Sequence, residues 1–310
     1  MTNMTTPNGA PASPFCFGTM QFGGKADHAA SRATYDACRA AKINFFDTAH
    51  VYTGGASETF LGEFAKNERD DLIIATKAGY EGGGSHPNIM KTFDESRQRL
   101  GMDVVDLFYM HRFDDATPLE ETFETLAHLR SDKKIRYIGI SNYTAWQVMK
   151  AVRVAAQFDI KPDVLQPMYN LVKRQAEVEI LPACLDQGID VCPYSPLGGG
   201  LLTGKYAEKS DGRLSHDQRY KDRYNVDWMH SAAAALPKIA TKYDTHPATL
   251  AVAWVAKNPA VTAPIISARD AKQLAPSLDA IKFEMTDAIY AEVTALSQTP
   301  APATDRLEEG

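Results

Sequence analysis

Short apolar runs alternate with amphipathic segments from residue 15 onward, and this alternation limits the fold more than any other feature of the chain. The early runs begin about 30 residues apart, which is the length of one strand–helix unit. Continuous apolar runs of this kind are typical of parallel strands that are covered on both faces. We predict strands over residues 15–20, 44–49, 72–79, 104–112, 135–142, 164–171, 189–196 and 261–267.

Eight strand–helix units without a break favour a single α/β domain with the (β/α)8 fold, a TIM barrel. A doubly wound sheet is the alternative, but no G-x-G-x-x-G follows the first predicted strand. The expected organisation is a polar N-terminal tail over residues 1–14, the barrel over 15–300, and a short C-terminal tail over 301–310.

Sequence signals also mark two helix starts and one long connection. Thr117 with Glu120, and Thr144 with Gln147, have the spacing of capping boxes, in which each side chain bonds the backbone of the other residue. Residues 197–227, after the seventh strand, are long, polar and charged. Connections of this length in a compact domain are usually lids or mobile segments, so we interpret this one as a flap over a bound ligand.

Net charge and cysteine usage argue against several classes of protein. With 33 basic and 39 acidic residues, the formal net charge of −6 disfavours general binding to nucleic acid or to anionic membranes. Cys16, Cys38, Cys184 and Cys192 form no C-x-x-C pair, which favours reduced thiols in a cytoplasmic protein. No apolar stretch approaches the ~20 residues of a membrane span, and the N-terminus has no secretory signal pattern.

Four reactive side chains stand at or just beyond the ends of three consecutive predicted strands. Asp47 and Tyr52 follow the second strand, Lys77 ends the third, and His111 ends the fourth. Barrel enzymes place their chemistry at the carboxyl ends of the strands, so all four side chains are expected at one mouth. Each of them alone is more often structural, but together they indicate a site.

These residue types suit the donation of a proton to a carbonyl oxygen. A free tyrosine, with a pKa of ~10, is a poor acid at neutral pH. A nearby Lys77 ammonium is expected to lower the pKa of Tyr52, and Asp47 to hold that ammonium in place. Neutral His111 can orient the carbonyl oxygen by a hydrogen bond. Such a site needs a hydride source, which side chains cannot supply.

The segment "FDTAHVYTGGASETFLG" resembles the signature of the aldo-keto reductases. Further segments, "IIATKAG", "DLFYMHRFD", "IGISNY", "LQPMYNL" and "YSPLGGGLLTGKY", resemble other parts of that family in the right order. The resemblance implies a reductase of aldehydes or ketones, a small-molecule carbonyl substrate, and NADP(H) as the cofactor. It also implies a catalytic tetrad of Asp47, Tyr52, Lys77 and His111, with Tyr52 as the proton donor.

The resemblance assigns cofactor contacts to the later strand ends. It implies that Tyr194 stacks on the nicotinamide ring and that the backbone around Ser195 approaches the pyrophosphate. Arg269 is implied at the 2′-phosphate, whereas Asp270 is the nearby acidic residue that NADH would require. The complete set of implied cofactor contacts is Thr19, Met20, Ser141, Asn142, Gln166, Tyr194, Ser195, Leu197, Gly198, Lys205, Ser267, Arg269, Gln273 and Ser277.

Substrate contacts and the barrel floor are less constrained by the sequence. We expect Met20, Phe22, Tyr80 and Phe113 to line the substrate site. Thr53 replaces the glycine that usually follows the tyrosine in the family. The N-terminal hairpin that closes the barrel floor in relatives is not evident, so the floor is expected to be closed otherwise or left open.

Two other functions remain as alternatives. A regulatory module with slow turnover, like the voltage-gated potassium channel β subunits that share this fold, would use the bound dinucleotide as a sensor. A metal-dependent barrel hydrolase would use His50, Asp47 and His111, although no H-x-H pair follows the first strand and Lys77 would repel a metal. The sequence predicts neither the physiological carbonyl compound nor the oligomeric state.

Overall fold

A computed structural model describes residues 2, 4–205, 217–306 and 308 of the chain. All eight predicted strands are present, and each is shorter than its apolar run. They are β1 (Cys16–Gly18), β2 (Phe45–Asp47), β3 (Ile73–Ala78), β4 (Val105–Met110), β5 (Ile135–Ser141), β6 (Val164–Gln166), β7 (Asp190–Val191) and β8 (Ile265–Ile266).

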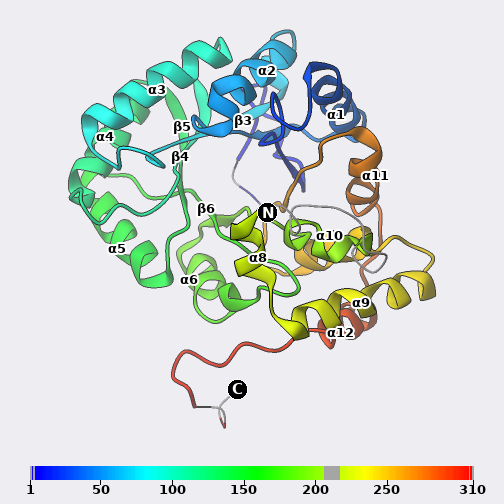
Figure 1. Cartoon of the computed structure of the whole chain (residues 1–310). Coiled ribbons are helices and arrows are strands. Elements are labelled where there is room, and N and C mark those ends of the chain that lie inside the picture. Colours follow the sequence, from blue (N-terminus) through cyan, green and yellow to red (C-terminus); the bar gives the residue numbers. More distant parts are fainter. Residues whose placement is uncertain (1, 3, 206–216, 307, 309–310) are drawn as a thin grey trace.

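The strands form one parallel sheet in the order β7-β6-β5-β4-β3-β2-β1-β8. The two edges of this sheet meet where Tyr194, just after β7, forms a parallel bridge with Ile265 of β8. There the backbone N–H of Ile265 donates to the carbonyl oxygen of Pro193 at 2.9 Å. Helices form a ring around the strands (Figure 1). The predicted single-domain (β/α)8 fold is therefore confirmed.

The helices begin close to the predicted signals, with one exception. The capping box of Thr144 and Gln147 is confirmed, because the backbone N–H of Thr144 donates to Gln147 Oε1 at 2.9 Å. The predicted cap at Thr117 is wrong, because its hydroxyl donates to Asp114 Oδ2 at 2.6 Å and the helix begins after Pro118. The described helices are α1 (His28–Ala40), α2 (Ala56–Ala65), α3 (His86–Leu100), α4 (Leu119–Ser131), α5 (Ala145–Ala155), α6 (Ile180–Gln187), α8 (Gln218–Tyr224), α9 (Asp227–Lys242), α10 (Pro247–Lys257), α11 (Ala271–Asp279) and α12 (Asp287–Thr294).

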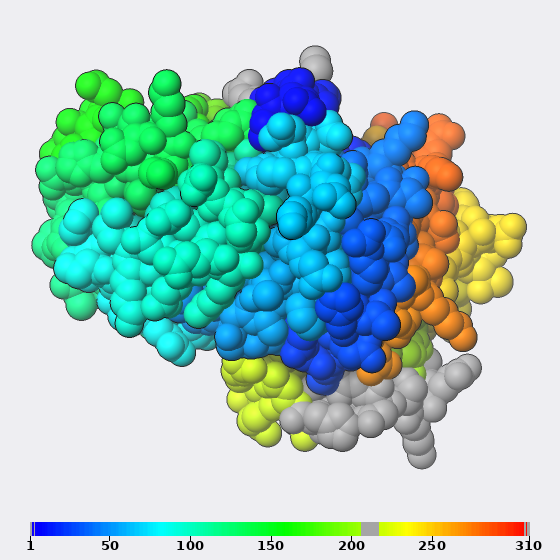
Figure 2. Space-filling model, turned by 90° about the horizontal axis from the view of Figure 1, so that it is seen from above, coloured from blue at the N-terminus to red at the C-terminus, as the bar shows by residue number. Residues whose placement is uncertain are grey.

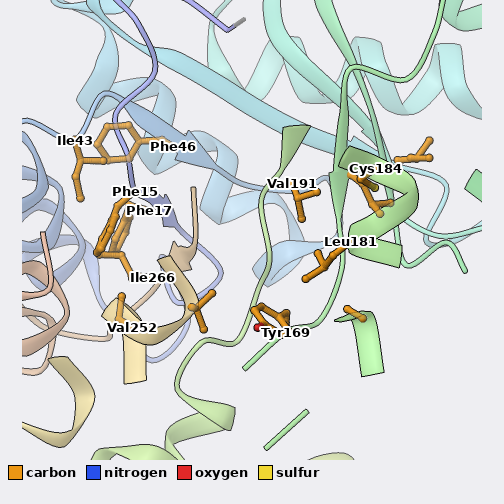
Figure 3. Close-up of a cluster of buried hydrophobic side chains, with 14 of the residues drawn as sticks. Phe15, Phe17, Ile43, Phe46, Tyr169, Leu181, Cys184, Val191, Val252 and Ile266 are labelled. Carbon is orange, nitrogen blue, oxygen red and sulfur yellow. The ribbon is translucent and has the colours of Figure 1, made fainter. Parts of the chain in front are cut away.

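Side chains of the strands alternate between the barrel interior and the layer beneath the helices, as a period of two requires. Cys16 of β1 and its register partner Phe45 of β2 belong to the interior cluster. The next residues, Phe17 and Phe46, belong to the outer cluster instead. Figure 3 shows Phe17, Phe46 and Ile266 gathered in this outer layer.

The same alternation turns two charged side chains into the barrel. Because Phe45 faces the interior, Asp47 two residues later faces it too, at the carboxyl end of β2. Lys77 follows Ile73 and Ala75 on the interior face of β3. Asp47 is 3% exposed and Lys77 is 1% exposed. The hydrophobic pattern of the strands thus fixes where these charges meet.

The N-terminal segment closes the other end of the barrel, which corrects the expectation of a polar tail without a hairpin. Met4 is 1% exposed and packs in the interior cluster. Thr5 pairs with Pro11 in an antiparallel bridge, and Arg136 Nη1 donates to the carbonyl oxygen of Thr5 at 2.7 Å. Figure 2 shows the darkest blue N-terminal residues at one end of the molecule and the yellow-green residues after position 216 at the opposite end.

Two further observations bear on the class of protein. All four cysteines are free and buried. Burial raises the pKa of the Cys184 thiol to about 12, which keeps it neutral and unreactive at ordinary pH. Among the described residues, no helix combines the length and the apolar character that crossing a bilayer would require.

Candidate active site

A cavity of about 1080 Å³ opens at the carboxyl ends of the strands. Its lining consists of three parts, which we name by the elements that carry them. The β1–β4 wall comprises the lining residues between Gly18 and Arg112. The β5–β8 wall comprises those between Ser141 and Lys205 and between Ile265 and Gln273. The α8 side comprises Arg219, Tyr220 and Arg223.

Three of the four candidate catalytic residues, Asp47, Tyr52 and His111, lie on the β1–β4 wall, and Lys77 is buried behind them. Lys77 Nζ donates to Asp47 Oδ1 at 2.5 Å and to the carbonyl oxygen of Thr48 at 2.7 Å. It also donates to the Tyr52 hydroxyl at 3.4 Å. A buried ammonium is costly unless it is paired and hydrogen-bonded, and these three acceptors meet that requirement. The ion pair therefore holds the ammonium beneath the phenol.

Burial and this ion pair shift two pKa values at the site. Burial raises the pKa of Tyr52 above its ordinary value, and the Lys77 ammonium opposes this only in part. The predicted net lowering of the Tyr52 pKa by Lys77 is therefore wrong, although the contribution of Lys77 has the expected sign. Burial alone would lower the pKa of Lys77, but Asp47 and the Tyr52 hydroxyl raise it more strongly, so Lys77 stays an ammonium.

His111 completes the group as a neutral imidazole. Its ring lies edge-on to the Tyr52 ring, with 5.9 Å between the ring centroids. Burial, the Lys77 ammonium and the Arg112 guanidinium lower the pKa of His111 to about 3. His111 Nδ1 is buried, and no residue in the described ranges hydrogen-bonds to it. A neutral ring beside a phenol can bond a carbonyl oxygen without carrying charge.

A charged network behind the wall fixes the loop that carries Tyr52. Buried Glu58 accepts a hydrogen bond from Thr76 Oγ1 at 2.6 Å and forms an ion pair with Arg99 Nη1 at 3.1 Å. Arg99 Nη1 also donates to the carbonyl oxygen of His50 at 3.0 Å. Gly55 is needed there, because a Cβ at that position would lie 2.6 Å from Arg99 Nε. The sequence analysis did not predict this network. The one sequence feature that pointed to it is the acidic residue Glu58 in "GGASE".

The β5–β8 wall is bonded directly to the four catalytic candidates. Gln166 Nε2 donates to Asp47 Oδ2 at 3.0 Å, and Asn142 Nδ2 donates to the carbonyl oxygen of His111 at 2.9 Å. The Tyr194 hydroxyl donates to Asn142 Oδ1 at 2.7 Å. These bonds hold amide and phenol groups at the border between the two walls.

The far part of the β5–β8 wall has features that fit a dinucleotide carrying phosphate groups. Ser267 Oγ is buried and has no hydrogen-bond partner among the described residues. Asp270 caps α11 by accepting from the backbone N–H of Gln273 at 2.8 Å, so its carboxylate is already engaged. Arg269 lies just before this helix start, where amide groups favour anions. Lys205 lines the same wall. Its Nζ approaches Gly200 closely, 3.0 Å from the position that a Cβ on this glycine would occupy.

Most of the residues predicted to contact a ligand line the cavity. On the β1–β4 wall these include Met20 and Tyr80. On the β5–β8 wall they are Ser141, Asn142, Gln166, Tyr194, Ser195, Leu197, Lys205, Ser267, Arg269 and Gln273. The identity of the ligand that each of them contacts remains a prediction.

The structure corrects the placement of two predicted substrate contacts. Phe22 is fully buried, and its ring centroid lies 5.8 Å from that of Phe17 in the outer core. Phe113 packs on Tyr143 and Trp146, with ring centroids 5.1 and 5.8 Å away. Neither ring lines the cavity. An aromatic residue after a strand can turn toward core or cavity, and its place in the sequence does not decide which.

Three predicted cofactor contacts also fall outside the cavity lining. Thr19 is fully buried, and its hydroxyl lies 2.8 Å from Ser57 Oγ. Ser277 is 1% exposed, on the buried side of α11. Gly198 is buried, although its neighbours Leu197 and Gly199 reach the cavity. Whether these positions contact a ligand stays a prediction.

Several cavity residues were not predicted, and four of them are cationic. The cationic ones are Lys25 and Arg112 of the β1–β4 wall and Arg219 and Arg223 of the α8 side. One available signal was that Arg112 directly follows His111. Another was the four-residue spacing of Arg219 and Arg223, which places both on one helix face. Of the predicted flap over 197–227, residues 206–216 lie outside the described residues.

The arrangement does not suit the metal-dependent alternative. His50 Nε2 lies 2.6 Å from Glu95 Oε2, and Asp47 is held by Lys77. Within the described ranges, no three His, Cys, Asp or Glu side chains lie together as metal ligands would. Two of the three residues that a hydrolase centre would require, His50 and Asp47, are thus bonded to other partners.

Comparison with known proteins points to one family. The model of the aldo/keto reductase family matches residues 14–298. A probable voltage-gated potassium channel subunit beta from Oryza sativa subsp. japonica is 34% identical over 294 residues, covering 88% of this chain and 89% of the relative. The L-glyceraldehyde 3-phosphate reductase of Escherichia coli K12 is 35% identical, covering 77% and 75%. The aflatoxin B1 aldehyde reductase member 2 of Rattus norvegicus is 36% identical, covering 77% and 70%.

Proposed function

Because this chain belongs to the aldo/keto reductase family, we propose that it reduces aldehydes or ketones to alcohols with NADPH and that Tyr52 donates the proton. The observation that carries this proposal is the position of Lys77 Nζ. It is bonded at once to Asp47 Oδ1 at 2.5 Å and to the Tyr52 hydroxyl at 3.4 Å. Two relatives that are named as aldehyde-reducing enzymes support the same reaction class.

Each catalytic residue has a defined task in this proposal. The raised pKa keeps Tyr52 protonated at neutral pH, so the phenol is present as a proton donor. Neutral His111 donates a hydrogen bond to the carbonyl oxygen and aligns it with the phenol. As the proton leaves, the Lys77 ammonium stabilises the phenolate that remains, and Asp47 keeps that ammonium in place. Bound nicotinamide would supply the hydride.

The β5–β8 wall would hold the cofactor. Ser141, Asn142 and Gln166 present hydroxyl and amide groups to the nicotinamide carboxamide, and Tyr194 presents its ring. Glycines near Ser195 let the backbone approach the pyrophosphate, where Lys205 adds a positive charge.

The part of the same wall that would bind the adenosine supports the proposal of NADPH over NADH. Arg269 beside the start of α11 suits a 2′-phosphate, because guanidinium binds phosphate with two parallel hydrogen bonds. Asp270 is engaged as the helix cap through Oδ1, which leaves it less free to bind a 2′-hydroxyl. Gln273 lies in the same region of the cavity lining and would face the adenine.

Cofactor titration followed by turnover assays tests this function. NADPH is expected to bind well below millimolar concentration and more tightly than NADH in a fluorescence titration. A panel of simple aldehydes should then oxidise NADPH, and Tyr52→Phe should lower kcat by about 10²–10⁴-fold. Undiminished turnover by Tyr52→Phe, or no binding of either nucleotide below millimolar levels, would overturn the proposal.

A second candidate function is a dinucleotide-binding regulatory module with slow turnover. It is favoured by the similarity to the potassium channel subunit from rice, which extends over most of both chains. The two functions differ in rate: steady turnover of simple aldehydes supports the reductase. A single slow oxidation of bound NADPH, together with a stable protein partner, supports the module.

A further inference from the structure

The cavity carries more positive charge than a dinucleotide alone requires. Lys205 and Arg269 lie on the β5–β8 wall, where the cofactor phosphates are proposed to bind. The β1–β4 wall adds Lys25 and Arg112, and the α8 side adds Arg219 and Arg223. Apart from Asp47, which is paired with Lys77, the described lining residues include one carboxylate, Glu81. Outside the β5–β8 wall, the described lining therefore has four cationic side chains and, besides the paired Asp47, one carboxylate.

Arg112 is the cation most closely connected to the catalytic rings. Its guanidinium carbon lies 5.0 Å from the centroid of the Tyr80 ring. The Tyr80 ring in turn lies 4.9 Å from the His111 ring, and His111 packs edge-on against Tyr52. Arg112 therefore stands one aromatic ring beyond the imidazole that is proposed to bind the carbonyl oxygen.

The guanidinium of Arg112 is well placed to bind an anion. In the described part of the chain, no carboxylate lies within 4 Å of it, whereas Arg219 already pairs with Asp217 at 3.1 Å. Stacking on Tyr80 uses the face of the guanidinium and leaves its N–H edge for a carboxylate or phosphate. Arg112 is exposed and lines the cavity, so an anion that enters the cavity can reach it.

The α8 side adds a second cation without an acidic partner. The guanidinium carbon of Arg223 lies 5.4 Å from the Tyr220 ring, and no described carboxylate forms an ion pair with it. Tyr220 and Tyr52 both line the cavity, so this helix borders the same space as the catalytic phenol. Arg223 thus adds to the positive potential in the cavity.

We propose that the physiological substrate is a carbonyl compound that also carries an anionic group, a carboxylate or a phosphate, bound by Arg112 with support from Arg223. The inference rests on the proposed reductase function and specifies its substrate class. The reaction itself is the reduction already described: the carbonyl carbon gains a hydride, its oxygen gains a proton, and the anionic group is unchanged. The anion orients the substrate so that its carbonyl lies between Tyr52 and His111.

Matched pairs of aldehydes, each with and without the anion, test this proposal. Succinic semialdehyde is compared with butanal, and glyceraldehyde 3-phosphate with glyceraldehyde, at saturating NADPH and low ionic strength. The anionic member is expected to have about tenfold or greater kcat/KM in at least one pair, because a charge-assisted hydrogen bond typically contributes that much. The pair with the larger ratio identifies carboxylate or phosphate. Added salt should reduce the ratio.

Charge-removing variants assign the preference to a residue. Arg112→Gln is expected to lower the anionic-to-neutral ratio of kcat/KM by about tenfold, mainly through KM for the anionic member. Arg223→Gln should lower it less. Arg153→Gln is the matched control, because Arg153 is exposed on α5, away from the cavity lining, and should keep the wild-type ratio.

The outcomes separate this inference from the proposed function. Reduction of the neutral aldehydes with no anionic preference would overturn the inference and leave the reductase function standing. A preference that survives Arg112→Gln and Arg223→Gln, or that Arg153→Gln abolishes equally, would also overturn it. Failure to reduce every aldehyde with NADPH would instead refute the reductase function itself.

Discussion

The two walls of the cavity are built from different kinds of residue. The β5–β8 wall consists largely of amides, hydroxyls and glycines, with Lys205 and Arg269 as its cations. The β1–β4 wall includes Asp47, which is paired with the buried Lys77, together with aromatic rings and exposed cations such as Arg112. The polar groups of the β5–β8 wall suit recognition of one ligand of fixed structure. The β1–β4 wall combines proton transfer with the binding of substrates that can differ in structure. We therefore expect the β1–β4 wall to govern kcat and the β5–β8 wall to govern cofactor affinity.

The largest effect is expected from breaking the ion pair of the β1–β4 wall. Lys77→Met removes the ammonium that contacts the phenol and leaves Asp47 buried without its partner. We expect kcat to fall by about 10²–10⁴-fold and the free energy of unfolding to fall by about 3–5 kcal/mol. Steady-state kinetics and denaturant unfolding measure the two quantities.

Tyr52→Phe is the matched control for Lys77→Met, since it removes the proton donor and keeps the ion pair. It should lose kcat to a similar extent and lose much less stability. If Lys77→Met kept most of its kcat while NADPH affinity collapsed, the assignment of this wall to catalysis would be wrong.

The next largest effect concerns the β5–β8 wall. Arg269→Ala should weaken NADPH binding by about tenfold or more, because a charge-assisted bond to the 2′-phosphate is lost. NADH, which has no phosphate there, should bind almost as before. Fluorescence titrations with both nucleotides measure the difference, with Arg153→Ala as the control for removing one positive charge. Equal losses for NADPH and NADH would contradict the phosphate role.

Strand positions were the part of the molecule most fully predictable from the sequence. The apolar runs place Asp47 and Lys77 near the carboxyl ends of adjacent strands, and the observed register turns both side chains into the barrel. The order of eight strands then follows from parallel pairing of successive runs. For this reason Asp47, Lys77 and His111 could be placed together from the strands, whereas Tyr52 lies on the loop after β2.

Loop residues were predicted less well, for a physical reason. Phe22 is core and Arg112 is cavity lining, yet each stands just after a strand. Which way such a side chain turns depends on the packing of neighbouring loops, and strand periodicity carries no information about that packing. The N-terminal segment differs from its prediction for a similar reason. It is mostly polar, and a single buried side chain, Met4, packs into the floor of the barrel without any periodic signal.

A smaller effect is expected from pH, and it tests the β1–β4 wall again. His111, with a pKa of about 3, stays neutral through the whole range in which the protein would be assayed. Tyr52 acts as an acid, so it is active when protonated, and its raised pKa moves the loss of activity to higher pH than for an ordinary tyrosine. At saturating NADPH, kcat for reduction should change less than about twofold between pH 6 and 9 and fall only above pH ~10. A fall centred near pH 7 would show that another group donates the proton.

The smallest effect is expected at Thr53 of the β1–β4 wall, where the stabilising contribution of a side-chain hydroxyl can be measured apart from the backbone conformation. Thr53 has φ 49°, where the family usually has glycine, and its hydroxyl makes two bonds. It donates to the carbonyl oxygen of Phe22 at 2.7 Å and accepts from the backbone N–H of Ser57 at 3.0 Å. Thr53→Ala should lower the free energy of unfolding by about 1–2 kcal/mol, because both bonds are lost while the strained φ remains. Thr53→Ser keeps the hydroxyl and should stay within about 0.5 kcal/mol of the wild type. Denaturant unfolding measures both variants. If the free energy of unfolding fell equally in both, the methyl group of Thr53 and not its hydroxyl would stabilise this loop.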